Sequence, residues 1–459
     1  MGLGPAQDTA GRPPVINRWV QLVAGIVAMM AIANLQYAWT LFTTPLTENL
    51  NTTLDMVQWA FAGFILAETW LVPFEGYMVD KLGPRIMLAI GGVLVGAGWV
   101  GAGLATSVQE LIALYVVGGV GAGVVYGGTI GNALKWFPDH RGLCVGFTSG
   151  AYGVGTALTV WPISRMIETS GYAQTLIVWG IIQGSLVVIA SLFMAKPPRD
   201  WVPEGWSPKD SQRSRVRVTA VDSTPWQMMR HSSFWIIYLM MTMLAFIGLV
   251  VTAQLSPIAK YYGVDKVTVA FGMSALILAI EVDRILNGVT RPFWGWVSDR
   301  IGRENTMFIA FSLQAVTVFC LLQLIDRPIW FVILSGLCFF AWGEIFSLFP
   351  AITADLFGTT WATTNYGVVY TAKGLASILA GPVAAVVAQG RLGWEPIFWT
   401  MIAFSLVAAF MALFWLKPTA ARTIARAQMT LKPSPFSGVS GGPAVVSLPE
   451  KARETVGGD

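Results

Sequence analysis

Charged residues are scarce in this chain, which has 459 residues of which only 12% are Asp, Glu, Lys or Arg. Soluble globular proteins carry about 25% charged residues. The deficit excludes a soluble globular enzyme, a disordered chain and a basic nucleic-acid-binding protein. Hydrophobic residues make up 55% instead, and the 48 glycines suit closely packed membrane helices. The composition therefore predicts a membrane protein that crosses the lipid bilayer several times.

Residues that bind metals or perform catalysis are also few. The three cysteines, Cys144, Cys320 and Cys338, lie far apart in or beside apolar segments. This spacing fits neither a metal site nor a disulfide framework, so we interpret them as small packing residues. The two histidines, His140 and His231, lie among loop charges. We therefore expect no metal and no cofactor.

Twelve apolar stretches are long enough to cross a bilayer as helices, which takes about 20 residues each. They lack the alternation that is typical of strands, so the sequence predicts an all-α integral membrane protein. The predicted spans are residues 17–43, 55–79, 86–105, 109–134, 142–167, 172–195, 233–258, 267–296, 305–325, 328–354, 365–390 and 394–416.

The spans fall into two groups of six, which define the expected domains. A cytoplasmic segment at 1–16 precedes a first six-helix bundle at 17–195. A polar, basic cytoplasmic linker at 196–232 leads to a second six-helix bundle at 233–416. Residues 417–459 are rich in proline, glycine and serine, so we predict a disordered cytoplasmic tail.

The positions of lysine and arginine set the expected orientation, because basic loops tend to stay in the cytoplasm. With both termini in the cytoplasm, most of the 29 basic residues are cytoplasmic and three lie inside spans. The basic residues then left in outside loops are Arg165, Lys260, Lys266, Arg327 and Arg391. The sequence therefore predicts a multi-pass membrane protein with both termini in the cytoplasm.

A short motif occurs at equivalent places in the two halves, between the second and third spans of each. It reads G-x-x-x-D-[KR]-x-G and is followed by a basic residue. Its glycines are expected to let helix ends approach closely, and its acid to cap or pair across the loop. The motif residues are Gly76, Asp80, Lys81, Gly83 and Arg85 in the first half and Gly295, Asp299, Arg300, Gly302 and Arg303 in the second. Two copies in register indicate an internal repeat.

The repeated motif resembles the loop signature of the major facilitator superfamily, whose two pseudo-symmetric halves enclose a site near the membrane midplane. Four further motifs resemble the bacterial oxalate/formate antiporter family. They begin at Gln36-Tyr37, Trp136-Phe-Pro-Asp, Arg291-Pro-Phe-Trp and Asn365-Tyr-Gly, the last followed by Lys373. The resemblance implies exchange of small carboxylates across the bacterial inner membrane by a monomer, with Arg291 and Lys373 at the central site.

Arg291 and Lys373 are the expected substrate-binding cations. The planar guanidinium of Arg291 fits a carboxylate with two parallel hydrogen bonds, and Lys373 is a compact charge. A dicarboxylate held between them is expected to contact both halves at once and to favour their closure. The alternatives are structural ion pairs, of Arg291 with Asp283 or a loop acid, and of Lys373 with Glu344 or Glu68.

Polar and aromatic residues on other spans complete a predicted substrate cage. Tyrosine hydroxyls and glutamine amides donate to carboxylate oxygens, and aromatic rings exclude water. The predicted cage consists of Gln36, Tyr37, Gln58, Tyr126, Tyr152, Trp342, Phe346 and Tyr370. The alternative for each is packing between helices, with its polar atoms bonded to the backbone.

Other charges within spans are candidates for coupling or gating, because ionisable residues are expensive in a bilayer. They are Glu68, Glu281, Asp283, Arg284 and Glu344. The spacing of Glu281 and Arg284 predicts an ion pair within a self-compensated cluster toward the outer half. Glu68 and Glu344 have no basic partner within a helical turn, so they are the better proton carriers unless a neighbouring helix supplies a cation.

A proton-coupled monocarboxylate symporter is the alternative function. Oxalate-selective members of the family have a tyrosine where this chain has Phe346 and a tryptophan where it has Tyr370, and they lack the four membrane acids. Animal monocarboxylate carriers have an acid four residues before the arginine, a position that Asn287 occupies here. An enzyme is not expected because no nucleophile–base pair converges. The glycine runs lack a nucleotide-binding context, so we expect neither nucleotide nor nucleic acid as a partner.

Overall fold

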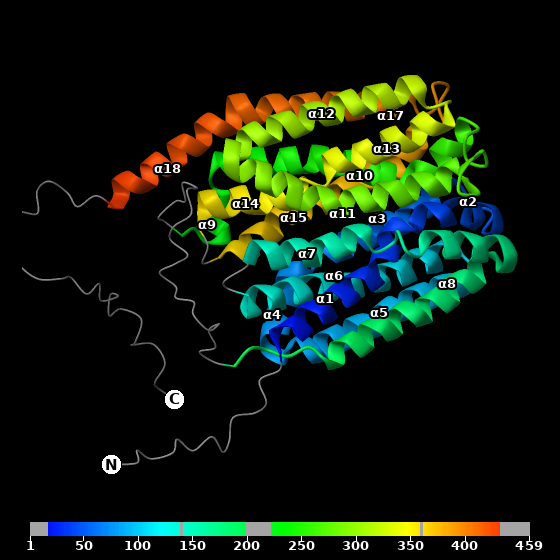
Figure 1. Cartoon of the computed structure of the whole chain (residues 1–459), viewed down its shortest axis with the longest axis horizontal. Coiled ribbons are helices and arrows are strands. Elements are labelled where there is room, and N and C mark those ends of the chain that lie inside the picture. The colour runs from blue at the N-terminus through cyan, green and yellow to red at the C-terminus, as the bar shows by residue number, and fades with distance from the viewer. Residues whose placement is uncertain (1–16, 138–140, 199–221, 359–360, 432–459) are drawn as a thin grey trace, which may run out of the picture.

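The computed structural model describes residues 17–137, 141–198, 222–358 and 361–431 (Figure 1). Helices dominate it and lie roughly along one long axis. The helices of the N-terminal half, coloured blue to teal, form one bundle, and those of the C-terminal half, coloured green to orange, form a second beside it (Figure 1). The predicted all-α class with two helical bundles is confirmed.

The N-terminal half contains eight helices, several of which are parts of one predicted span. They are α1 (Arg18–Tyr37), α2 (Trp39–Asn49), α3 (Leu54–Trp70), α4 (Val72–Leu82), α5 (Pro84–Leu104), α6 (Val108–Trp136), α7 (Arg141–Val154) and α8 (Val160–Leu192). Helices α3 and α4 are bent by 49° with Pro73 in the first turn of α4. Gly171 has a φ of 81° and divides α8 into two arms.

The C-terminal half begins with a short helix in the predicted linker and includes one small hairpin. Its elements are α9 (Pro225–Met229), α10 (Ser232–Tyr261), β1 (Thr268–Ala270), β2 (Met273–Ser274), α11 (Ala275–Ile301), α12 (Arg303–Leu324), α13 (Pro328–Trp342), α14 (Ile345–Phe357), α15 (Ala362–Ile378), the π-helical turn η2 (Leu379–Val383), α16 (Ala384–Ala388), α17 (Glu395–Met411), the π-helical turn η3 (Ala412–Leu416) and α18 (Lys417–Leu431).

Nine described stretches of helix are long and apolar enough to cross a membrane, and the bent pair α3–α4 makes ten. The fifth and eighth predicted spans are missing from this count for identifiable reasons. The fifth is split between α7, which has 14 residues, and the first arm of α8. The eighth, α11, carries several charges in its apolar region, among them Asp283, Arg284 and Arg291. Each of the twelve predicted spans nevertheless lies mostly in helix.

Two predicted boundaries are corrected. Residues 268–274 form the antiparallel hairpin β1–β2 rather than the start of a span, because Phe271 and Gly272 have positive φ values of 54° and 71° that turn the chain. Helix α18 continues the chain to Leu431, so a disordered tail does not begin at 417. The alanine and arginine residues of α18 favour helix, which the composition of the following residues obscured.

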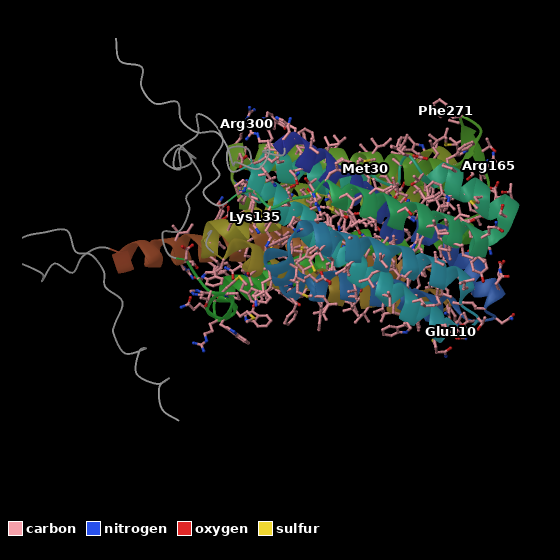
Figure 2. All side chains as sticks on the ribbon, turned by 90° about the horizontal axis from the view of Figure 1, so that it is seen from below. Met30, Glu110, Lys135, Arg165, Phe271 and Arg300 are labelled. Atoms are coloured by element: carbon pink, nitrogen blue, oxygen red, sulfur yellow. The ribbon has the colours of Figure 1, made fainter. Side chains whose placement is uncertain are left out.

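The two ends of the bundle differ, and we name them by what they carry. The end where α1 begins and α17 ends, beside α9, is the terminal face (Figure 1). The opposite end is the hairpin face, where Phe271 of the hairpin, Arg165 and Glu110 lie (Figure 2). Figure 2 shows Lys135 and Arg300 at the terminal face.

At the hairpin face the two halves are joined by polar contacts between α2 or α3 and the C-terminal half. These contacts link Glu48 to Lys260, Thr40 to the backbone N–H of Ser256, Asp55 to Gln389, and Gln58 to Gln254 and the carbonyl of Ala253. Their lengths lie between 2.7 and 3.5 Å. The halves are therefore held together on this side of the molecule.

The two copies of the loop motif have the same backbone. Gly83 has φ 94° and ψ 154°, and Gly302 has φ 91° and ψ 154°. Each glycine ends one helix and begins the next, and each N–H donates to the carbonyl four residues back, at Val79 and Ser298. An internal repeat accounts for this agreement, because glycine tolerates a positive φ that other residues resist.

Other motif residues behave differently from expectation. A Cβ atom at Gly76 or Gly295 would meet nothing within 4 Å, so the expected close approach of helices at these glycines is wrong. In the second copy Arg303 pairs with Asp299 at 2.6 Å and with Asp355 of α14 at 3.2 Å. In the first copy Lys81 lies 4.6 Å from the centre of the Tyr77 ring, Arg85 is exposed, and the side chain of Asp80 lies outside the described residues.

Substitution of Gly302 by alanine tests the backbone requirement. The positive φ strains any L-residue, so we expect Gly302→Ala to destabilise the protein by about 1–3 kcal/mol. Gly295→Ala is the matched control, because that glycine is helical and has open space. The apparent melting temperature in detergent should fall for Gly302→Ala and not for Gly295→Ala. Equal melting temperatures of the two variants would contradict the strain at Gly302.

Candidate functional site

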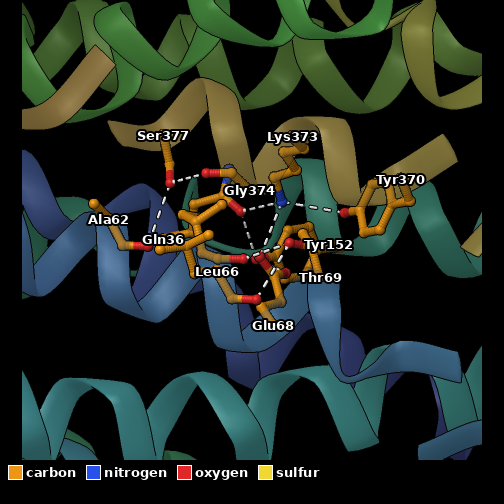
Figure 3. A network of polar contacts seen from close by, with 11 residues as sticks. Gln36, Ala62, Leu66, Glu68, Thr69, Tyr152, Tyr370, Lys373, Gly374 and Ser377 are labelled. Carbon is orange, nitrogen blue, oxygen red and sulfur yellow. Dashed lines mark hydrogen bonds and ion pairs between the residues drawn. The ribbon is translucent and has the colours of Figure 1, made fainter. Parts of the chain in front are cut away.

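Lys373 of α15 lies at the centre of a buried polar network that joins the two halves (Figure 3). Its Nζ lies 2.9 Å from Oε2 of Glu68 on α3 and 3.0 Å from Oε1 of Gln36 on α1. Within its own helix it lies 3.1 Å from the hydroxyl of Tyr370. The side chains of Lys373 and Glu68 are both 0% exposed. The structure therefore shows the ion pair between Lys373 and Glu68 that the sequence analysis gave as an alternative.

Tyr152 of α7 completes this network from the N-terminal half. Its hydroxyl lies 2.8 Å from Oε1 of Gln36 and 2.9 Å from Oε1 of Glu68 (Figure 3). A hydroxyl has one proton, so it donates to one of these oxygens at a time. Glu68 is therefore paired with Lys373 at Oε2 and lies within hydrogen-bonding distance of Tyr152 at Oε1, so a neighbouring helix does supply the cation that the sequence left open.

Arg291 of α11 is buried close to the same network. Its Nη1 donates to the carbonyl oxygen of Ser149 on α7 at 2.5 Å. Within the described part of the chain its Nε and Nη2 have no hydrogen-bond partner. The guanidinium carbon lies 4.4 Å from the centre of the Phe346 ring, and Lys373 Nζ lies 5.9 Å from the same centre. The two predicted cations are thus brought together around one aromatic ring.

Both cations extend from the C-terminal half, which corrects the expectation that they grip a substrate from opposite halves. Helix α11 packs against α7, and α15 packs against α3. The N-terminal half supplies the oxygen atoms that these cations contact, namely those of Ser149, Glu68 and Gln36. The contact between the halves is therefore one of cations on one side with oxygens on the other.

Aromatic rings from both halves enclose the network, as the predicted cage requires. Tyr126 of α6 stacks on Tyr370 of α15 with ring centres 5.8 Å apart and an interplanar angle of 8°. Tyr37 and Tyr126 each contact Tyr152, at 5.2 and 5.5 Å between centres. Phe346 contacts Tyr370 at 6.3 Å. These residues form a continuous aromatic wall around Lys373 and Arg291.

Two predicted cage residues have other roles. Gln58 lies ten residues before Glu68 on α3, which is about 15 Å along a helix, and it bonds Trp39, Gln254 and the carbonyl of Ala253 near the hairpin face. Trp342 donates to the carbonyl of Leu244 at 3.0 Å and fills the space left by Gly248, where a Cβ would overlap its ring. Trp342 therefore packs against Phe346 and is not part of the polar network around Lys373.

The predicted ion pair between Glu281 and Arg284 on α11 does not form among the described residues. Among the residues that the structure describes, no ion pair joins Arg284 to Glu281 or Asp283. Arg284 and Asp283 are both fully buried, whereas Glu281 is partly exposed. The i,i+3 spacing permitted the pair, but the guanidinium of Arg284 instead lies against the rings of Tyr37 and Phe339.

Two acids outside the Lys373 network are also buried. Glu344, between α13 and α14, is 1% exposed, and its Oε2 has no partner among the described atoms. Glu75 of α4 is 5% exposed, and neither of its oxygens has a partner there. A Cβ at Gly123 would lie 2.6 Å from Oε2 of Glu75, so that glycine makes room for the acid. No sequence pattern links Gly123 to Glu75, because their contact arises from the packing of α6 against α4.

Comparisons with known proteins agree with this arrangement. Residues 24–286 and 284–448 match the profile of a family described as the Major Facilitator Superfamily. The Oxalate:formate antiporter of Oxalobacter formigenes is 34% identical over 400 residues, which cover 87% of this chain and 91% of that protein. Monocarboxylate transporter 12 of Mus musculus is more distant, with 24% identity over 338 residues that cover 68% of this chain and 67% of that protein.

Solved structures show the same fold. The crystal structure of a D-xylose-proton symporter superposes with a TM-score of 0.67 at 17% sequence identity, covering 88% of this chain and 98% of that one. An inward-open conformation of the xylose transporter XylE from E. coli also gives a TM-score of 0.67, at 15% identity. It covers 87% of this chain and 96% of that one.

Proposed function

The chain belongs to the major facilitator superfamily and to the family of the oxalate:formate antiporter, and we propose that it exchanges small carboxylates across a membrane by alternating access. The exchange is of oxalate-like dianions for formate-like monoanions. The chain is a multi-pass membrane protein, and its named relatives are transporters rather than enzymes. The proposal accordingly assigns no chemical step to it.

The observation that carries the proposal is the pair of buried cations around Phe346. Arg291 has two guanidinium nitrogens without a partner among the described residues, and its third bonds only a neutral carbonyl. A carboxylate accepts two parallel hydrogen bonds from such a fork. A second carboxylate group on the same substrate would reach toward Lys373, whose Nζ lies 5.9 Å from the centre of the same ring.

Substrate binding also explains how the halves change their contacts. In this conformation the cations of the C-terminal half, Arg291 and Lys373, contact oxygens of the N-terminal half. These oxygens belong to Ser149, Gln36 and Glu68. A substrate carboxylate is a stronger acceptor than the Ser149 carbonyl or the Gln36 amide, and at Lys373 it competes with the carboxylate of Glu68. Because both cations belong to one half, this differs from the expectation that the substrate favours closure. The substrate would replace contacts between the halves and so change the relative stability of the two conformations.

We propose that the protein lies in a bacterial inner membrane with its terminal face toward the cytoplasm. Basic side chains support this orientation, because Lys135 and Arg300 lie at the terminal face (Figure 2). We propose a monomer as the working unit.

Counterflow in proteoliposomes tests the proposal. Vesicles loaded with unlabelled formate are exposed in turn to labelled oxalate, formate, lactate and pyruvate, with and without a pH gradient. We expect exchange of oxalate and formate that does not require the gradient. Uptake of lactate and pyruvate alone, and only with a gradient, would support the other function instead.

That second function is proton-coupled monocarboxylate symport. The observation that favours it is the buried ion pair of Glu68 with Lys373. A buried acid bonded to the substrate-binding lysine could exchange a proton as substrate arrives. For an exchanger we expect Glu68→Gln to lose stability but, per amount of folded protein, to keep counterflow that is insensitive to a protonophore, because the amide oxygen still accepts from Lys373 and carries no titratable proton. Glu344→Gln is the matched control, since Glu344 is buried but outside the network. Accumulation lost in Glu68→Gln alone would establish symport.

A further inference from the structure

A second arginine lies on the same helix as Arg291, deep in the protein. Arg284 is two helical turns closer to the hairpin face, about 10 Å along α11. It is 0% exposed. Its guanidinium carbon lies 4.3 Å from the centre of the Tyr37 ring and 4.2 Å from that of Phe339. Since Tyr37 belongs to the N-terminal half and Phe339 to the C-terminal half, Arg284 lies between the two halves.

The polar atoms around Arg284 are unsatisfied as a group. None of its three guanidinium nitrogens has a hydrogen-bond partner within the described ranges of the chain. The same holds for the hydroxyl of Tyr37 and for both side-chain polar atoms of Asn287. Aromatic faces attract the charge of a guanidinium, but they do not satisfy the N–H donors in its plane. Buried donors of this kind normally have an acceptor.

Asp283 does not serve as that acceptor. Asp283 is buried and directly precedes Arg284 in the sequence. Consecutive side chains on a helix point about 100° apart, so these two diverge. No N···O contact of 4 Å or less joins the two among the residues described. Both oxygens of Asp283 are themselves without a partner there.

Asn287 connects Arg284 to the central site. It follows Arg284 by three residues and precedes Arg291 by four, so the three side chains lie along one stripe of α11. All three are buried. The stripe runs from a position near the hairpin face to the Phe346 ring, and it offers a carboxylate an unbroken row of hydrogen-bond donors.

We propose that Arg284, Tyr37 and Asn287 form a second binding station for small carboxylates, on the hairpin-face side of the central site. The choice of ligand rests on the proposed function. When the halves separate at the hairpin face, Tyr37 moves away from Arg284, and an anion that enters there meets this arginine first. Asn287 then lies on its way to Arg291. The station acts on substrate from the hairpin face and not on substrate from the terminal face.

The test compares Arg284→Gln with the unsubstituted protein in membrane vesicles of both orientations, with labelled oxalate as the probe. We expect the KM for oxalate presented to the hairpin face to rise by about tenfold or more, as the loss of a hydrogen bond to a charged group predicts. The KM for oxalate presented to the terminal face should not change. Arg165→Gln is the control, because Arg165 lies at the hairpin face but is exposed and paired with Glu168.

Two further variants keep the proposal falsifiable. Arg284→Lys retains the charge and should raise the same one-sided KM by a smaller factor. The double variant Asp283→Asn with Arg284→Gln should resemble Arg284→Gln, whereas recovery would show that Arg284 serves only to balance Asp283. Equal changes in the KM for oxalate presented to either face would also contradict the second binding station. Failure of the proposed function is distinct, since the unsubstituted protein would then exchange no oxalate from either face.

Discussion

Arg291→Lys is expected to reduce the rate of oxalate–formate exchange by about one to two orders of magnitude, while the protein still reaches the membrane. Lysine keeps the positive charge but loses the planar fork. A single ammonium group cannot hold the Ser149 carbonyl and both oxygens of a carboxylate in the arrangement that the guanidinium allows. The stacking of the guanidinium on Phe346 is lost as well.

Initial rates of counterflow, normalised to the amount of protein in the vesicles, measure this effect. Arg165→Lys is the matched control for an arginine-to-lysine exchange outside the site, and its rate should equal that of the unsubstituted protein. Arg291→Lys with a normal rate would show that charge alone is needed, and it would refute two-point carboxylate binding.

The second large effect concerns the ion pair between Lys373 and Glu68. Removal of one partner from a buried pair leaves an uncompensated charge, which destabilises proteins by about 3–5 kcal/mol. Lys373→Gln should therefore lower the apparent melting temperature strongly. Glu68→Gln combined with Lys373→Gln should restore most of the stability, because no charge then remains on either residue.

Transport should not recover together with stability. In the double variant the exchange of oxalate should stay low, since a dianion needs the second cation, whereas formate can still bind Arg291. Rates for the two labelled anions and melting temperatures of the same preparations measure this separation. Equal losses for oxalate and formate, or a double variant as unstable as Lys373→Gln, would contradict the role given to this pair.

The helical architecture could be predicted because it depends on local composition. Apolar runs of membrane length identify spans wherever charge is low, and Gly83 and Gly302 mark equivalent turns because their positive φ requires glycine. The same reasoning failed at the start of α11, where the hairpin β1–β2 is too short to leave a periodic pattern. It also failed at α18, where tail composition concealed a helix.

The central residues could be predicted individually but not their partners. Arg291 and Lys373 are conspicuous because a charge is rare in an apolar span. Their contacts depend on tertiary packing: Lys373 and Glu68 are 305 positions apart in the sequence, and Arg291 bonds a backbone carbonyl, which no side-chain pattern reveals. Helical spacing likewise suggested a pair of Glu281 with Arg284, whereas the guanidinium of Arg284 lies against the rings of Tyr37 and Phe339.

The most direct test of carboxylate exchange compares vesicles that differ only in their contents. Purified protein is reconstituted into proteoliposomes that are empty or loaded with formate, and the uptake of labelled oxalate is followed with a protonophore present. The account predicts rapid uptake into loaded vesicles and little into empty ones, unaffected by the protonophore. Equal uptake into empty and loaded vesicles, abolished by the protonophore, would contradict exchange and identify a proton-coupled carrier.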